Sequence, residues 1–317
     1  MEQVRTTEAK TPEKKKSKKV RKSTIEHWSM CALPILHIVV FCYLPLFGII
    51  IAFKDYKYVD GILGSEWNGL DNFKVFFMGR SFKKIVANTV FMNLLQIFCG
   101  NLAAITLAIL TYNLKSRIKV KIFQTALITP NFMSWVIAAY MVYAFLHPTN
   151  GFINQVLISV GMDPVNWYGD PGPWRVILII CDIWKEFGMG SIMYYAALMA
   201  IDQELFDACA IDGGGKWARV RYIMFPAMTA IIVIKLIFAL GGIFGGDFGL
   251  YYQVPRNIST LYPVTDILPT YIFRLTRVDG NFATGAAAGL IQNIVGFFLV
   301  IATNFVVKKI DPEKALF

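Results

Sequence analysis

The sequence predicts an all-α protein that crosses a membrane several times. Of its 317 residues, 56% are hydrophobic and only 16% are charged, and the mean hydropathy is +0.52. Ordinary soluble domains carry roughly 25% charged residues, so too little polar sequence remains here to cover a surface exposed to water. The apolar runs continue to the C-terminus, which favours one membrane domain over two soluble ones.

Six segments are long enough to span a bilayer, which takes about 20 mainly apolar residues in a helix. They are residues 30–53, 86–112, 122–146, 174–200, 226–246 and 283–307. The fifth is the weakest, because Lys235 interrupts it and paired glycines thin its end. The first is too long for the apolar part of a cleaved signal peptide, so we expect it to remain attached. The chain therefore divides into a basic tail over 1–29, a six-helix membrane domain over 30–307 and a short tail over 308–317.

The distribution of Lys and Arg predicts that both termini lie in the cytoplasm. Segment 1–29 carries nine of these residues and 113–121 carries four, whereas 147–173 has none. Segment 54–85, with six, opposes the rule. A basic run directly before a membrane helix is better explained by contact with anionic lipid than by nucleic-acid binding.

The connection over 201–226 holds the most informative pattern. Asp202 suits the N-cap of a helix over 203–211, and Gly213-Gly214-Gly215 ends that helix. We expect 216–224 to form a second short helix, and Pro226 to open the fifth span. Several apolar side chains on this loop have no lipid to enter and need a protein partner: Leu205, Phe206, Ala210, Ile211 and Trp217.

This loop resembles the signature of the binding-protein-dependent ABC importer permeases. Their pattern is Glu-Ala-Ala, three residues, Gly, nine residues, Ile, one residue and Leu-Pro. At the same spacing this chain has Asp207-Ala208-Cys209, Gly213, Ile223 and Phe225-Pro226. Ala210-Ile211-Asp212-Gly213 is typical of the carbohydrate-uptake branch. Asp in place of Glu, Cys in place of Ala and Phe in place of Leu are departures, and the first shortens the acidic side chain by one methylene.

The resemblance extends over nearly the whole chain and is closest to the polysaccharide and oligosaccharide permeases of Gram-positive bacteria. The further matching segments are Phe53-Lys54-Asp55-Tyr56, Gly69-Leu70-Asp71-Asn72-Phe73, Asn88-Thr89 and Asp182-Ile183-Trp184-Lys185-Glu186. It implies a type I importer fold in the bacterial cell membrane and a sugar or oligosaccharide as solute. It also implies three kinds of partner: a second homologous permease, ATPase subunits that bind ATP and Mg, and an extracytoplasmic solute-binding protein. The residues implied to dock on the ATPase are Asp207, Ala208, Cys209, Asp212, Gly213, Ile223 and Pro226.

Polar groups inside the predicted spans are candidates for a solute pathway, because burying them in lipid is costly. Asp182, Lys185 and Glu186 share one helical face, which either faces the pathway or holds helices together as an ion-pair cluster. Aromatic rings and amides either contact a sugar or pack between helices. These are Trp135, Tyr140, Tyr143, Trp184, Tyr194, Tyr195, Asn88, Asn93, Gln96, Asn101, Gln292 and Asn293. Gly285 and Gly289 in the last span allow close helix approach.

Lys235 is the most unusual residue of the predicted spans. It lies about 13 Å beyond Pro226 at 1.5 Å per residue, where a lysine costs roughly 2.5–3.5 kcal/mol. We expect it to face the protein interior and to pair with Glu186 or, as a second choice, with Asp182. The alternative is a lysine that faces a water-filled cavity without a partner.

The sequence offers no site for catalysis or a cofactor. Gly213-Gly214-Gly215-Lys216 lacks the flanking residues of a phosphate-binding loop, so we expect separate subunits to bind ATP. The three histidines show no metal spacing, and the five cysteines form no C-x-x-C pair. Two alternatives stay open: an importer for another solute, such as a peptide, and a secondary transporter. The missing internal repeat and the loop over 201–226 argue against the second.

Overall fold

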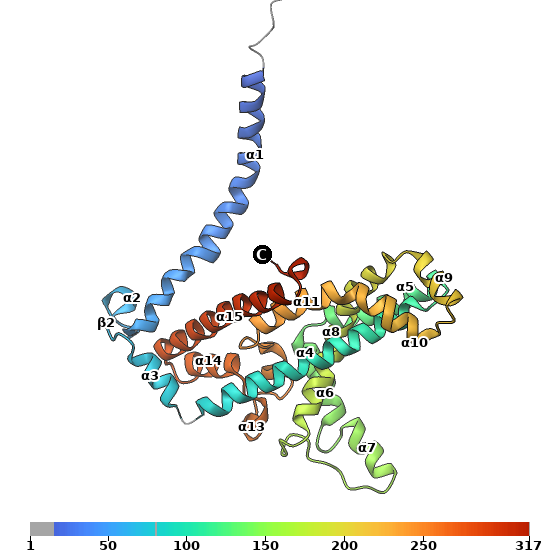
Figure 1. The fold of residues 1–317 in the computed structure, drawn as a ribbon. Coiled ribbons are helices and arrows are strands. Elements are labelled where there is room, and N and C mark those ends of the chain that lie inside the picture. The colour runs from blue at the N-terminus through green and yellow to red at the C-terminus, as the bar shows by residue number, and fades with distance from the viewer. Residues whose placement is uncertain (1–15, 80, 317) are drawn as a thin grey trace, which may run out of the picture.

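The computed structural model describes residues 16–79 and 81–316, and this part of the chain is mostly helical, as predicted (Figure 1). Lys14 and Lys15 of the basic tail lie outside the described residues. The longer helices are α1 (Lys16–Ile38), α4 (Phe82–Tyr112), α5 (Arg117–Ile128), α6 (Trp135–Leu146), α8 (Trp174–Met199), α11 (Phe225–Gly241), α14 (Leu268–Arg277) and α15 (Phe282–Ile310). The shorter ones are α2 (Gly61–Gly64), α3 (Asp71–Met78), α7 (Phe152–Ser159), α9 (Gln203–Ile211), α10 (Lys216–Arg219), α12 (Phe248–Gln253) and α13 (Tyr262–Thr265). Strands β1 (Lys54–Asp55) and β2 (Glu66–Trp67) pair antiparallel and close the loop after the first helix.

Four helical stretches are long and apolar enough to cross a membrane: His27–Phe53, Phe82–Tyr112, Lys216–Gly241 and Phe282–Ile310. The bent pair of α5 and α6 raises the count to five. Helix α8, with 26 residues, is also long, but Asp182, Lys185 and Glu186 in its middle set it apart from these apolar helices. The six-span topology stays a prediction.

The third predicted span, 122–146, is not one continuous helix. Helix α5 and the 3-10 turn Thr129–Phe132 meet α6 at a bend of 99°. Pro130 opens the 3-10 turn, and the Ser134 hydroxyl accepts a hydrogen bond from the Ile137 amide at 3.3 Å, starting a new helix. A proline ring and an N-cap side chain this close together favour a break over a continuous helix.

The predicted second short helix over 216–224 is also wrong as a separate element. Helix α10, a π-helical turn over Val220–Met224 and α11 follow one another as one stretch, Lys216–Gly241. The Phe225 amide bonds to the Val220 carbonyl, five residues back, directly before Pro226. The wider turn accommodates the proline, which has no N–H and crowds the preceding turn. A π turn over Val39–Tyr43 precedes Pro45 in the same way.

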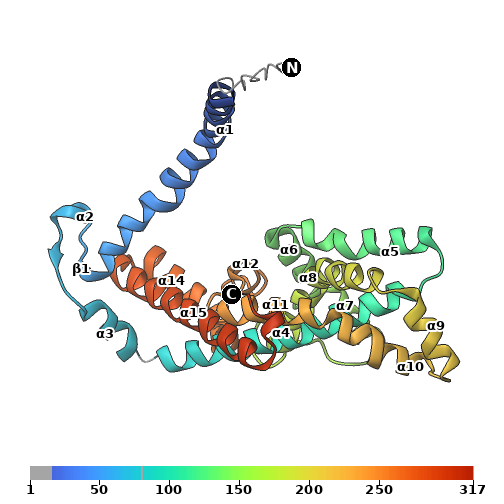
Figure 2. The same cartoon turned by 45° about the horizontal axis from the view of Figure 1, so that its top comes forward.

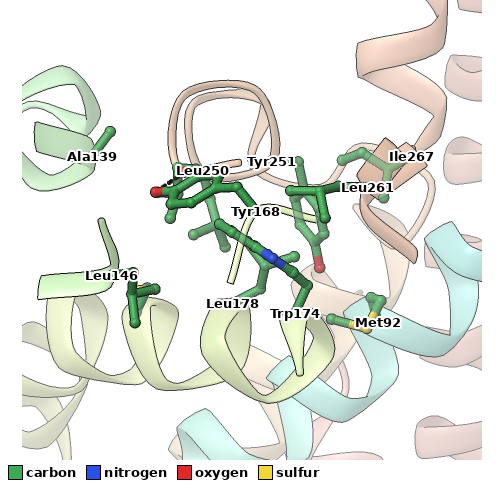
Figure 3. Close-up of a cluster of buried hydrophobic side chains, with 12 residues drawn as sticks. Met92, Ala139, Leu146, Tyr168, Trp174, Leu178, Leu250, Tyr251, Leu261 and Ile267 are labelled. Carbon is green, nitrogen blue, oxygen red and sulfur yellow. Dashed lines mark hydrogen bonds between the residues drawn. The ribbon is translucent and has the colours of Figure 1, made fainter. Parts of the chain in front are cut away.

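The largest core cluster joins α4, α6, α8, α12 and the connections that close over them (Figure 3). Trp167, Tyr168 and Trp174 suit a headgroup layer by their sequence, but Tyr168 and Trp174 are buried in this cluster. The Trp174 indole donates to the Trp167 carbonyl at 2.6 Å, and Trp167 donates to the buried Asn154 at 3.0 Å. These bonds fold the connection over 147–173 onto the end of α8, which buries the rings of Tyr168 and Trp174.

Helix α1 leaves the remaining helices and touches them only near its C-terminal continuation, where residues 44–53 pack against α15 (Figures 1 and 2). Within the body, α8 packs along α4, and α15 packs against α11 and α14. The predicted close approach at Gly285 is confirmed, since a Cβ there would collide with Thr276 of α14. Around Gly289 there is open space instead.

Candidate functional site

A cavity of about 790 Å³ lies between α4, α8, α11 and the start of α12. Its polar side chains are Asn93, Gln96 and Asn101 from α4, Asp182 and Glu186 from α8, Lys235 from α11, and Asp247 at the α12 N-cap. Phe187, Phe248 and several glycines complete the wall. The mixture of rings, amides and charges on a concave surface is typical of a small-molecule site.

The charged residues of α8 divide between the cavity and a neighbouring contact. Asp182 and Glu186 line the cavity. Lys185 is buried behind it, with its ammonium 3.4 Å from the Glu186 carboxylate and 4.9 Å from the centre of the Trp135 ring. Asn131, at the break between α5 and α6, donates to Glu186 at 3.1 Å. Glu186 therefore both lines the cavity and joins helices.

Lys235 faces the interior as predicted, but its expected pairing with Glu186 or Asp182 is wrong. Its ammonium lies over the ring of Tyr194, 4.9 Å from the ring centre, and the ion pairs formed among the described residues do not include it. Tyr194 is itself buried and donates its hydroxyl proton to Asn101 at 2.6 Å. The electron-rich ring face stabilises the ammonium in place of a carboxylate.

Gln96 has the clearest unmet bonding capacity of the cavity wall. Its side chain is 8% exposed, and its amide nitrogen has no hydrogen-bond partner in the described part of the chain. Its neighbour Asn93 donates to the Thr89 carbonyl at 2.7 Å. A buried amide without a partner is costly, so Gln96 offers a donor to a ligand that carries hydroxyl or carbonyl oxygens.

The remaining pathway candidates lie elsewhere. Trp135 donates its indole N–H to Asp247, and Tyr143 stacks against Arg256 next to a smaller pocket. Trp184 and Gln292 are half-buried and absent from the walls of both pockets. Sequence reasoning missed Asp247, Asn131 and Arg256, because all three fall at breaks or in connections rather than inside regular apolar runs. Asp247 gave one usable signal, since Asp directly before an apolar stretch favours a helix N-cap.

Tyr143, which contacts Arg256, also contacts Tyr168, with the two ring centres 5.4 Å apart. Burial raises the pKa of the Tyr168 hydroxyl, and the nearby Arg256 cation opposes that rise only in part. The phenol therefore stays protonated and neutral. Arg256 gains no phenolate counter-ion from it.

The loop over 201–226 forms a helix-turn-helix at one end of the molecule (Figure 2). The predicted N-cap is confirmed, since the Asp202 carboxylate accepts from the Glu204 amide at 3.2 Å. Gly213 ends α9 with φ at +75°, a left-handed conformation that favours glycine. Of the residues implied to dock on an ATPase, Asp207, Ala208, Asp212, Gly213 and Pro226 are exposed, and Cys209 and Ile223 are half-buried.

The apolar side chains of this loop separate into two groups. Ile211 and Trp217 are 87% and 74% exposed, and Leu205 is also exposed. Phe206, which the sequence assigned to a partner surface, is instead buried and stacks on Tyr112 at 5.8 Å between ring centres. Phe206 therefore attaches the loop to α4, while the other three leave an apolar surface without cover in this chain.

These features define a membrane permease: apolar helices, a polar cavity between them and an exposed apolar loop at one end. The chain belongs to the family of binding-protein-dependent transport system inner membrane components, whose model matches residues 100–312. The resemblance inferred from loop 201–226 is therefore confirmed. The family consists of transport permeases rather than enzymes, and its members are membrane components of ABC importers.

Curated relatives and solved structures agree with this assignment. Protein LplB of Bacillus subtilis is 32% identical over 279 residues, covering 88% of this chain and 87% of LplB. The polygalacturonan/rhamnogalacturonan transport system permease protein YteP of the same organism is 32% identical, covering 88% of this chain and 86% of YteP. A chain of a bacterial alginate ABC transporter, solved with its alginate pentasaccharide-bound periplasmic protein, superposes with a TM-score of 0.82 at 29% identity. That match covers 93% of this chain and 98% of the solved chain.

Proposed function

We propose that this permease imports an oligosaccharide delivered by an extracytoplasmic solute-binding protein, and that loop 201–226 couples the import to ATP hydrolysis on separate subunits. The observation that carries the proposal is the exposed apolar surface of Leu205, Ile211 and Trp217 on a loop with the family's spacing. The sugar assignment is supported by the names of similar permeases, which transport polygalacturonan/rhamnogalacturonan, lactose or alginate.

The cavity chemistry supports a sugar. Asn, Gln and carboxyl side chains supply the donors and acceptors that pair with hydroxyl groups, and the rings of Phe187 and Phe248 supply apolar surface. The unpartnered Gln96 amide fits an uncharged oxygen. A membrane enzyme is not favoured, because the matching family consists of transport permeases.

The helices supply a direct mechanical route from loop to cavity. Trp217 and Lys235 lie on the same continuous helical stretch, Lys216–Gly241. Eighteen residues separate them, about 27 Å at 1.5 Å per residue. Phe206 and Tyr194 add a second attachment, because both belong to the core cluster that joins α8, α9 and α4. When ATPase subunits move the loop, we expect this stretch to transmit the movement to Lys235 and so reshape the cavity.

The proposed assembly follows the family pattern. Both termini and loop 201–226 lie in the cytoplasm of a bacterium, and the chain crosses the membrane six times, with α8 as the fourth span. A second homologous permease completes the cavity, and ATPase subunits bind ATP and Mg, so this chain itself needs no cofactor. Nucleic acid has no part in the assembly.

Affinity purification of the tagged permease from its native membrane tests the proposal. We expect ATPase subunits and a second permease to co-purify, and Asp207→Ala to reduce the ATPase yield severalfold. Asp163→Ala, an exposed acid in the opposite connection, is the matched control and should change nothing. Wild-type permease that purifies without any ATPase would contradict the coupling role.

Cysteine labelling of intact cells tests the orientation separately. In a cysteine-free background, Lys216→Cys and Lys314→Cys should resist a membrane-impermeant reagent, and Asp163→Cys should react. Strong labelling of either lysine position in intact cells contradicts the proposed topology.

A further inference from the structure

A second pocket of about 230 Å³ lies between α6, the end of α12 and the segment that follows α12. Its lining includes Tyr140, Tyr252, Gln253, Arg256 and Asn257. Two phenol rings, two amides and one guanidinium offer an apolar face together with donors and acceptors. Neither the family match nor the names of the relatives assigns a role to these residues.

Arg256 is held by aromatic rings instead of by a carboxylate. Its guanidinium carbon lies 4.1 Å from the centre of the Tyr143 ring and 5.6 Å from that of Tyr140. The side chain is exposed, and none of the ion pairs among the described residues includes it. Stacking uses the flat face of a guanidinium and leaves its N–H edge free for a planar, two-oxygen acceptor.

Arg274 provides a comparison within the same connection. Its guanidinium bonds directly to the buried carboxylate of Asp266 and also lies over the rings of Tyr262 and Tyr271. Arg274 therefore has the environment of a structural arginine. Arg256 also lies over two tyrosine rings but has no carboxylate in a direct ion pair among the described residues. This is the arrangement expected where a ligand supplies the carboxylate.

The backbone at this point is strained. Arg256 and Asn257 have φ of +57° and +51°, the positive values found at non-glycine residues of the described chain. The Tyr262 hydroxyl donates to the Asn257 side chain at 3.0 Å and helps to hold this conformation. Left-handed backbone at non-glycine residues concentrates at ligand-binding sites, where the surrounding structure maintains it.

Helix α12 lines the main cavity with Phe248 and Gly249 and the pocket with Tyr252 and Gln253. Helices α6 and α12 pack together, starting at the contact of Trp135 with Asp247 on the cavity wall and ending at the contact of Tyr143 with Arg256. Lys235 lies in the cavity in a similar setting, over a tyrosine ring and outside the ion pairs. In the described part of the chain, Lys235 and Arg256 are thus two cations that lie over tyrosine rings and outside direct ion pairs.

We propose that Arg256, seated on the rings of Tyr143 and Tyr140, forms an entrance subsite that binds the carboxylate group of an acidic sugar residue in the solute. This inference rests on the proposed function, because it specifies the class of oligosaccharide. The N–H edge of Arg256 binds the two carboxylate oxygens, and the neighbouring amides of Gln253 and Asn257 bind sugar hydroxyls. The orientation proposed above places the subsite on the outer side, where the solute leaves its binding protein.

The test uses the complete transporter, reconstituted in vesicles with its binding protein. Uptake of trigalacturonate, trimannuronate and the neutral maltotriose is measured for the wild type, Arg256→Gln and Arg256→Lys. The wild type should import at least one of the two acids. Arg256→Gln should lower kcat/KM for that acid about tenfold or more, as expected for the loss of a charge-assisted hydrogen bond, and Arg256→Lys should lower it less. Arg277→Gln, an exposed arginine in the last turn of α14, should match the wild type.

A second measurement separates a carboxylate on the sugar from one on the binding protein. The affinity of solute-free binding protein for the vesicles should be the same for the wild type and Arg256→Gln. Weaker docking of the variant would assign the carboxylate to the binding protein and overturn the inference.

The uptake outcomes also distinguish this inference from the proposed function. Wild-type uptake of maltotriose without uptake of either acid, or acid uptake that is unchanged in Arg256→Gln, overturns the inference and leaves oligosaccharide import intact. Absence of uptake of all three sugars overturns both.

Discussion

The ammonium of Lys235 on α11 lies over the ring of Tyr194 on α8, 4.9 Å from the ring centre. The Tyr194 hydroxyl in turn donates to Asn101 on α4, so one side chain links three helices around the cavity. This relationship replaces the ion pair with Glu186 that charge balance predicts. It also changes the expected outcome of double substitutions.

A double-mutant cycle between Lys235→Met and Tyr194→Leu should give a coupling energy of about 0.5–2 kcal/mol, the range for a partly desolvated cation–π contact. The cycle between Lys235→Met and Glu186→Gln should give a smaller coupling, because Glu186 is engaged by Lys185 and Asn131. Thermal unfolding of the purified variants measures both cycles. A larger coupling with Glu186 than with Tyr194 would show that the ring contact is not the main partner.

Gly213 should tolerate side chains according to their backbone preference and not their size. No atom lies within 4 Å of a Cβ built there, but φ is +75°. A left-handed residue with a Cβ costs about 1–2 kcal/mol, and Asn adopts this region more readily than Val. We therefore expect uptake to fall in the order Gly213, Gly213→Asn, Gly213→Val, with normal amounts of protein in the membrane.

Gly215 is the matched control for that series. It is equally exposed and has open space around it, but its φ of −80° suits any residue. Gly215→Val should retain most of the uptake. Equal losses at the two positions would mean that the loop requires small residues for contact and not for conformation.

Substitutions in loop 201–226 should separate the stability of the protein from its binding to the ATPase. Phe206→Ala removes a buried ring that stacks on Tyr112, so it should lower the free energy of unfolding by about 3–5 kcal/mol. Trp217→Ser alters an exposed ring and should leave the melting temperature unchanged while weakening ATPase binding at least severalfold. Thermal unfolding and co-purification of the ATPase report the two effects. Unchanged ATPase binding in Trp217→Ser would remove Trp217 from the docking surface.

Gly188 fixes the approach of α8 to α5. A Cβ at this position would collide with the backbone carbonyl of Leu127, which cannot move as a flexible side chain can. Gly188→Ala should therefore destabilise the protein by about 1–3 kcal/mol. Gly289→Ala, with open space in α15, should be neutral or stabilise by up to about 1 kcal/mol. Melting temperatures that rise in both variants would contradict the observed helix contact.

The sequence predicted those features that depend on local pattern. The low charge and the long apolar runs predicted a helical membrane fold, and the residue spacing in loop 201–226 indicated the family. The N-cap at Asp202 and the left-handed Gly213 follow from the properties of single residues. The placement of Asp182 and Lys235 in the interior follows from the cost of charge in lipid.

Features that depend on packing between distant segments could not be predicted. Tyr194 is 41 residues from Lys235, and only the crossing of α8 and α11 brings them together. Pro130 is a local signal that a helix ends or kinks, but the 99° angle between α5 and α6 cannot be read from that signal. The burial of Tyr168 and Trp174 depends on the folding of an entire connection onto the core.

The central claim is that ATP hydrolysis on separate subunits drives transport through this permease by way of loop 201–226. It is tested most directly by solute uptake into vesicles that contain the complete transporter, with ATP enclosed and all ion gradients collapsed. We predict uptake that requires hydrolysable ATP, persists without any ion gradient and is lost in Gly213→Val while the subunits remain assembled. Uptake that proceeds on an ion gradient without ATP would contradict the claim and indicate a secondary transporter.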